Sequence, residues 1–114
     1  MKQPGKKGEH HKFYYFGLMG RVEPLRIMMN YTGFDYEEIN YSMAEWPSKK
    51  AEMPGGSMPV LEFSNGVRMC QTVSMARYIA KLGGVYPSDP YQRWLGDSLM
   101  EDYNDQICGP LTMV

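Results

Sequence analysis

The amino-acid sequence predicts an α/β domain in which a β-α-β unit is followed by a β-β-α unit and then by one more helix. Short aromatic and apolar runs, typical of strands, alternate with segments whose apolar residues recur every three or four positions, as they do along a helix. Glycine and proline stand at the boundaries between these segments. The last two strand-like runs are joined by Asn65-Gly66, a pair that favours a tight hairpin turn.

The β-α-β unit begins with the aromatic run KFYYF at residues 12–16, which suits a buried strand. A helix then begins near Arg21, because Pro24 is tolerated only in a first turn, and Gly33 suits its C-cap. The side chains at helical spacing are Val22, Leu25, Met28, Met29 and Thr32. Residues 36–41 form the second strand, so we expect a parallel pair with a right-handed crossover.

The β-β-α unit follows a connector at residues 43–54, which is predicted to be a short irregular helix or a loop. Residues 59–63 and 67–70 are predicted to be antiparallel strands on either side of the tight turn. An amphipathic helix then runs from Gln71 to the glycine pair at 83–84. Its apolar positions are Val73, Ala76, Ile79 and Ala80.

A last helix is predicted from Asp89-Pro90 to about Ile107, with the aspartate as N-cap and the proline at the first helical position. Residues 1–11 are rich in lysine, glycine and proline, so we expect a flexible extension. This extension contains both histidines, His10 and His11, and we expect no metal site there, because two adjacent histidines without a third ligand give poor zinc geometry.

The composition of the 114-residue chain favours one small globular domain. A formal net charge of -1 argues against a nucleic-acid module, and no apolar run is long enough to insert in a membrane as a helix. The two cysteines, Cys70 and Cys108, have neither metal-binding nor redox spacing, which favours a reducing compartment and therefore the cytoplasm. An organellar or cytoskeletal assembly is the alternative.

Four stretches together carry a family resemblance: YYFGLMGRVEPLR, AEWPSKK, GSMPVLEF and CQTVSMARYIA. In this order, the chain resembles the N-terminal, thioredoxin-like domain of cytosolic glutathione transferases, closest to the sigma-like group that uses a tyrosine. The resemblance implies a glutathione-binding domain at residues 12–84. It also implies that residues 85–114 are a linker and the first helix of an otherwise absent all-α C-terminal domain, the domain that receives the second substrate in this family.

The resemblance places the thiol chemistry on Tyr15 and Arg21. A hydroxyl that donates to the glutathione sulfur stabilises the thiolate, lowering a thiol pKa from about 8.5 toward neutrality, and a nearby cation adds to this effect. Tyr14 is expected to point to the opposite face, because side chains alternate along a strand. The plain alternatives are that both tyrosines are core aromatics and that Arg21 is a surface arginine.

The remaining tripeptide contacts are also implied by the resemblance. Trp46 and Lys50 match positions that hold the glycyl end, and a cis bond between Met58 and Pro59 would turn the Met58 main chain toward the cysteinyl residue. Helix N-termini attract anions, so Gln71 and Thr72 would hold the γ-glutamyl carboxylate. The alternatives are that Lys50 is an ordinary loop lysine, that Pro59 is a proline at the start of an edge strand, and that Gln71 and Thr72 only cap the helix. Ser57 replaces a longer polar residue, which removes one expected contact.

Asp97 loosely matches an acidic residue that reaches the glutathione of the partner subunit, and a solvated helix face is the favoured alternative. Cys70 is expected to be a small packed residue rather than a nucleophile. We therefore expect a glutathione transferase-like protein that activates the thiol for conjugation or isomerisation, with glutathione as co-substrate and no metal. The alternative is a non-catalytic structural subunit. Either way, the apolar last helix suggests a dimer or a larger assembly that covers it.

Overall fold

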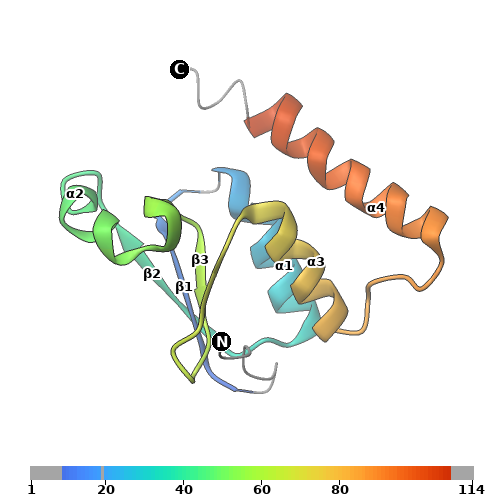
Figure 1. The fold of residues 1–114 in the computed structure, drawn as a ribbon, viewed down its shortest axis with the longest axis horizontal. Helices are drawn as coiled ribbons and strands as arrows, with labels where there is room; N and C mark the ends of the chain where they lie inside the picture. The colour runs from blue at the N-terminus through green and yellow to red at the C-terminus, as the bar shows by residue number, and fades with distance from the viewer. Residues whose placement is uncertain (1–8, 19, 109–114) are drawn as a thin grey trace.

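The computed structural model describes residues 9–18 and 20–108, with side-chain environments up to residue 105. The strands are β1 (His11–Phe16), β2 (Tyr36–Tyr41), β3 (Val60–Glu62) and β4 (Arg68–Cys70). The helices are α1 (Glu23–Thr32), α2 (Trp46–Lys49), α3 (Thr72–Leu82) and α4 (Pro90–Asp102). Shorter turns are η1 (Gly20–Val22), η2 (Lys50–Glu52), η3 (Pro54–Gly56) and the π-helical η4 (Tyr103–Cys108). The predicted order of elements is confirmed (Figure 1).

The four strands form one mixed sheet in the order β2-β1-β3-β4. β1 is parallel to β2 and antiparallel to β3, which in turn is antiparallel to β4. Tyr14 pairs with Val60, and Val60 pairs with Cys70. It follows that the carboxyl ends of β1, β2 and β4 and the amino end of β3 all lie at the same edge of the sheet.

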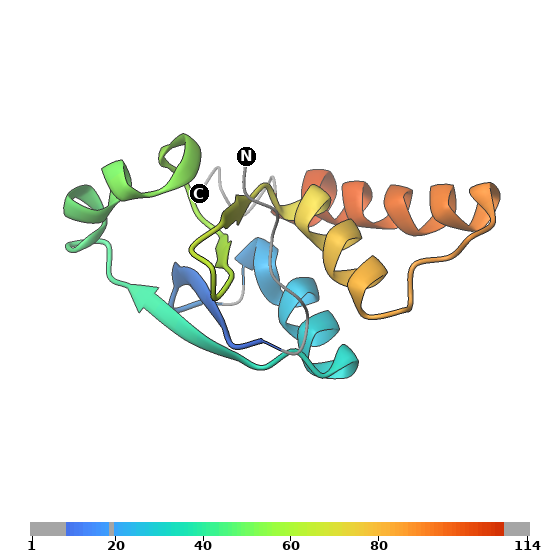
Figure 2. The ribbon, with the colours of Figure 1, turned by 60° about the horizontal axis from the view of Figure 1, so that its bottom comes forward.

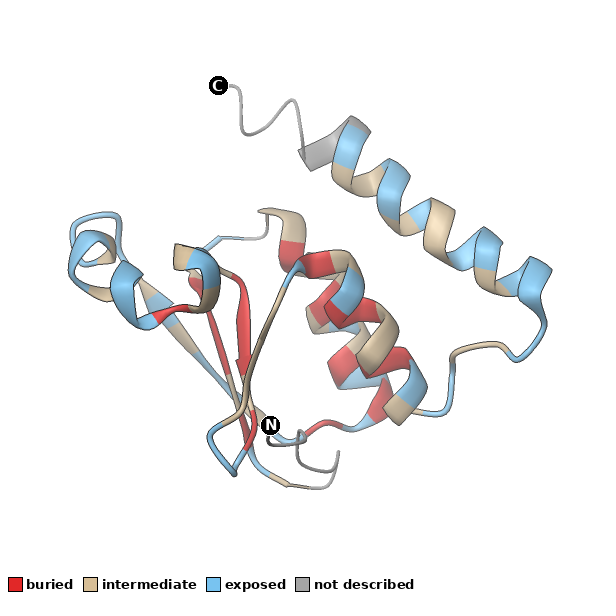
Figure 3. Ribbon diagram, in the orientation of Figure 1, coloured by how far each residue is buried: buried red, intermediate tan, exposed pale blue. Residues whose placement is uncertain are grey.

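Helices α1 and α3 lie side by side against one face of the sheet (Figures 1 and 2). The main hydrophobic core lies between these two helices and the sheet, and it includes Tyr15. Tyr14 belongs to a smaller cluster on the opposite face, with Met53 and Val60. Most of the buried residues therefore lie on β1, on β3 and on the inner sides of α1 and α3 (Figure 3). The predicted alternation of Tyr14 and Tyr15 is confirmed.

The helix boundaries follow the predicted signals. Pro24 lies in the first turn of α1, and Gly33 caps its end in the left-handed region at φ 79°. Asp89 caps α4 by accepting a hydrogen bond from the Gln92 N–H at 3.0 Å, and Pro90 follows it. The connector at residues 43–54 contains α2 and η2 and reaches into η3, so the short irregular helix is the correct alternative.

The expectation of a flexible extension is wrong for its last residue. His11 opens β1 and is 0% exposed, with its ring centroid 5.1 Å from that of Phe34 and 4.8 Å from that of Phe63. Packing between two aromatic rings outweighs the polarity of the imidazole. His10 is exposed, and hydrogen bonds from its ring to the carboxylates of Glu37 and then Asp35 raise its pKa. Residues 1–8 of the expected extension lie outside the described residues.

Helix α4 buries none of its residues. Trp94 is 59% exposed and Leu99 is 69% exposed, so the apolar surface predicted for this helix is present. Figure 1 shows α4 running beside α3 and then approaching η1 with its carboxyl end.

Candidate functional site

The sheet register gathers the predicted site residues at one edge. Tyr15 is the second-last residue of β1, the Met58-Pro59 pair leads into β3, and Gln71 follows β4. The segment after β2 carries the glycyl-end candidates, Trp46 in α2 and Lys50 in η2. Four chain segments that are distant in sequence therefore converge at the edge where their strands begin or end.

Tyr15 is 6% exposed, and its hydroxyl reaches the turn that follows β1. A Cβ atom on Gly20 would lie 2.8 Å from this hydroxyl, so the absence of a side chain at Gly20 leaves the room that the hydroxyl occupies. Gly20 has φ 47°, in the left-handed region that glycine adopts without strain. Both the conformation and the space at this position therefore require glycine.

Arg26 lies over the ring of Tyr15, with its guanidinium carbon 5.8 Å from the ring centroid. It forms ion pairs with Glu38 at 2.7 Å and with Glu23 at 3.1 Å, and it donates a hydrogen bond to the Leu18 carbonyl at 2.9 Å. Burial would lower the pKa of Arg26, but the hydrogen bonds to Glu38 and Glu23 raise it. The guanidinium thus stays charged beside the tyrosine and holds the turn.

Arg21 lies in η1, directly after Gly20, and is half-buried. Across residues 9–18 and 20–105 the structure shows no ion pair or hydrogen bond of the Arg21 side chain. A cation without a carboxylate partner at this edge keeps its field available to a bound anion.

The peptide bond between Met58 and Pro59 is cis, as expected. Pro59 is buried and Met58 is half-buried, in contact with both hydrophobic clusters. Trp46 packs edge-to-face on Phe16 with ring centroids 5.6 Å apart. Lys50 is exposed, and its aliphatic stem lies beside Gly56, where a Cβ atom would be 3.5 Å from the lysine Cε.

The start of α3 has no side-chain cap. Gln71 precedes the helix with φ 75° and ψ 110°, a conformation that is strained for a residue with a side chain. Its carbonyl accepts the Met75 N–H at 2.8 Å, but no side chain caps the helix. Thr72 is the first helical residue and is buried. The first N–H groups of α3 therefore have no intrahelical acceptor and carry the positive end of the helix dipole.

Tyr14, on the opposite face of the sheet from Tyr15, contacts residues of β3 and β4. Its hydroxyl donates to Glu62 Oε1 at 3.4 Å, and the guanidinium carbon of Arg68 lies 5.3 Å from its ring centroid. Burial, followed by the charge of Glu62, raises the pKa of the Tyr14 phenol. Cys70 is half-buried against the same cluster, as expected of a small packed residue.

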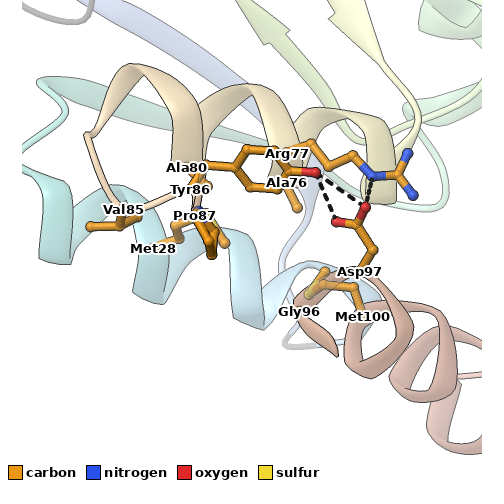
Figure 4. Close-up of a pocket in the computed structure, with 10 residues that line it drawn as sticks. All are labelled: Met28, Ala76, Arg77, Ala80, Val85, Tyr86, Pro87, Gly96, Asp97 and Met100. Carbon is orange, nitrogen blue, oxygen red and sulfur yellow. Dashed lines mark hydrogen bonds and ion pairs between the residues drawn. The ribbon is translucent and has the colours of Figure 1, made fainter. Parts of the chain in front are cut away.

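Asp97 contacts its own chain and is only half-exposed. Arg77 Nε lies 3.0 Å from Asp97 Oδ2, an ion pair without hydrogen-bond alignment, and the Tyr86 hydroxyl donates to the same oxygen at 3.2 Å. These residues border a cavity of about 250 Å³ between α1, α3 and α4 (Figure 4). The contact links α4 to α3, so Asp97 does not lie on a freely solvated helix face.

Sequence reasoning missed Gly20, Arg26 and Tyr103. The Tyr103 hydroxyl donates to the Gly20 carbonyl at 3.0 Å, across 83 positions of sequence. Arg26 is the last residue of the stretch YYFGLMGRVEPLR, but the resemblance assigned it no role. Local spacing could have indicated Gly20, because glycine commonly marks a turn that needs positive φ, but no local signal predicts the contact with Tyr103.

The described part of the chain contains no group of three or more His, Cys, Asp or Glu side chains arranged to hold a metal ion. Among the described helices, none is long and apolar enough to cross a membrane.

Comparison with known proteins identifies the family. Residues 11–81 match the family model described as the glutathione S-transferase N-terminal domain. The chain is 35% identical over 95 residues to a glutathione S-transferase of Anopheles gambiae, which covers 83% of this chain and 46% of that protein. It is 34% identical over 96 residues to hematopoietic prostaglandin D synthase of Gallus gallus, covering 84% of this chain and 48% of that protein.

Solved structures of glutathione transferases are also similar to this chain. A Nu-class glutathione transferase from Haemonchus contortus superposes with a TM-score of 0.76 at 34% identity, over 84% of this chain and 47% of that one. The chain thus spans about half the length of the relatives it matches. Its thioredoxin-like fold, its family match and its similarity to these proteins show that the chain belongs to the glutathione S-transferase family.

Proposed function

We propose that this chain binds glutathione at the edge of the sheet and activates its thiol for conjugation or isomerisation. The observation that carries the proposal is the convergence at one edge of the Tyr15 hydroxyl, the cis Met58-Pro59 bond and the uncapped start of α3. Membership of the family supports glutathione as the co-substrate. The non-catalytic alternative gains no support from the relatives described above.

In this proposal the two carboxylates of the tripeptide are held at opposite ends. The first N–H groups of α3, with Gln71 and the Thr72 hydroxyl, receive the γ-glutamyl carboxylate. Trp46 donates its indole N–H and Lys50 supplies a countercharge to the glycyl carboxylate. The Met58 main chain pairs with the cysteinyl residue, which places the thiol toward the end of β1.

Tyr15 and Arg21 then favour ionisation of the thiol. The thiol proton passes to solvent, the Tyr15 hydroxyl donates a hydrogen bond to the sulfur, and the Arg21 charge stabilises the thiolate. The thiolate is the species that attacks an electrophilic carbon. Metal ions have no role in this scheme.

The second substrate and the assembly also belong to the proposal. Relatives include proteins called glutathione S-transferase and prostaglandin D synthase, so both conjugation and isomerisation are in range. A dimer would cover the exposed apolar face of α4, and within it Asp97 would approach the partner's glutathione by exchanging its contact with Arg77. A cytoplasmic location suits the proposed use of glutathione.

Calorimetric titration with glutathione tests the binding half of this proposal. We expect saturable binding to the chain, and a loss of affinity of about tenfold or more in the double variant Gln71→Ala, Thr72→Ala, because charge-assisted hydrogen bonds are worth roughly 1.5–3 kcal/mol. The matched control is Ser74→Ala, an exposed hydroxyl of the same helix, which should bind as the parent does. Absence of binding to the folded parent chain would refute the proposal.

A further inference from the structure

A hydrogen bond joins the residue that follows α4 to the turn beside Tyr15. Tyr103 is the first residue of η4, which continues directly from α4, and its hydroxyl donates to the Gly20 carbonyl at 3.0 Å. η1 and η4 pack against each other in the structure. Tyr103 itself is half-buried, so this bond is partly shielded from solvent.

Gly20 is the residue through which this bond can act on the thiol site. The room on its side-chain side is taken by the Tyr15 hydroxyl, 2.8 Å from the Cβ position, and its main chain is in the left-handed region at φ 47°. Glycine populates many conformations, so a glycine in one particular conformation has to be held by contacts from outside the turn. A rotation of Gly20 would change both the space at the Tyr15 hydroxyl and the direction of Arg21.

The turn is held at two carbonyls by two different elements. Arg26 of α1 donates to the Leu18 carbonyl at 2.9 Å, and Tyr103 donates to the Gly20 carbonyl. Arg26 is fixed by ion pairs within the first domain. Tyr103 supplies a contact from η4, the continuation of α4, so the conformation at Gly20 depends on where α4 ends.

We infer that Tyr103 is a positioning residue for the thiol site: its hydroxyl holds Gly20 and thereby sets the Tyr15 hydroxyl and Arg21. This inference rests on the proposed function for its catalytic meaning. The geometric part, that Tyr103 controls the surroundings of the Tyr15 hydroxyl, holds in the absence of glutathione as well.

The test uses the 114-residue chain with Tyr103→Phe, which removes the hydroxyl and keeps the ring. The matched control is Tyr91→Phe, a solvent-exposed tyrosine of α4, the helix that leads into η4. Ultraviolet absorbance of bound glutathione against pH gives the apparent pKa of its thiol. We expect Tyr103→Phe to raise this pKa by about 0.5 to 1 unit, with a dissociation constant within about twofold, and Tyr91→Phe to change neither.

A second measurement needs no ligand. With tyrosine labelled at the ring carbon that bears the hydroxyl, the nuclear magnetic resonance signal of Tyr15 is assigned by its loss in Tyr15→Phe. We expect this signal to shift or broaden in Tyr103→Phe and to stay in place in Tyr91→Phe. Circular dichroism and thermal unfolding verify that each variant is folded.

The outcomes separate this inference from the proposed function. An unchanged Tyr15 signal together with an unchanged thiol pKa in folded Tyr103→Phe overturns the inference. A parent chain that fails to lower the thiol pKa of glutathione overturns the proposed function, and the Tyr15 signal then still decides whether Tyr103 positions it. A fall in melting temperature alone, with both readouts unchanged, assigns Tyr103 a structural role and also overturns the inference.

Discussion

Replacement of Gly20 with alanine tests the geometry around Tyr15 most sharply. The new Cβ would lie 2.8 Å from the Tyr15 hydroxyl and 2.7 Å from Leu18 Cδ1, both closer than carbon contacts allow. Leu18 is exposed and can move aside, but the Tyr15 ring is buried, so the hydroxyl or the turn itself must shift. The left-handed backbone at φ 47° adds about 1–2 kcal/mol of strain for a residue with a Cβ.

Gly33→Ala is the matched control for this prediction. Gly33 also has positive φ, at 79°, but nothing lies within 4 Å of its Cβ position. Gly33→Ala should lower the free energy of unfolding by about 1–2 kcal/mol in urea titrations because of backbone strain, and Gly20→Ala should lower it further because of the added clash with Tyr15. Only Gly20→Ala should also raise the thiol pKa of bound glutathione, by about one unit. Equal thiol pKa values in the two variants would refute the account of Gly20.

Three further outcomes are expected. Because hydrogen bonds from the exposed His10 ring to Glu37 and Asp35 raise the pKa of His10, their stabilising contribution is present below the unfolded pKa of about 6.5 and is lost as pH rises through the folded pKa. His10→Gln should therefore lower the melting temperature at pH 5 more than at pH 8, and an equal effect at both would exclude this role. Ile79→Ala removes a fully buried side chain of α3 and should reduce the free energy of unfolding by about 2–5 kcal/mol, measured by urea titration; a loss below about 1 kcal/mol would contradict the assigned core. Asp97→Asn weakens a part-exposed ion pair, so the free energy of unfolding should fall by less than about 1 kcal/mol. Because this pair joins α4 to α3, hydrogen exchange along α4 should become faster.

The sequence predicted the elements whose signals are local. Gly33, Pro24 and Asp89 mark helix ends through their own backbone preferences, and these signals are read without knowledge of the fold. Periodicity also predicted the opposite orientations of Tyr14 and Tyr15, because strand geometry alone determines them.

What the sequence did not predict depends on contacts between distant segments. His11 looked like part of a polar tail, but Phe34 and Phe63 enclose it only once β1 and β3 are in one sheet. The bond from Tyr103 to Gly20 likewise needs the end of α4 to meet η1. The polar neighbours of Asp97 come from α3 and from the loop before α4, so their ion pair is a property of the packing.

The central claim is that Tyr15 stabilises the thiolate of bound glutathione, and the pH dependence of thiolate absorbance in the parent chain and in Tyr15→Phe tests it most directly. The account predicts a bound thiol with a pKa clearly below the usual value of about 8.5 in the parent chain, and a return toward that value in Tyr15→Phe while glutathione still binds. The same thiol pKa in both proteins, with glutathione bound to each, would contradict it.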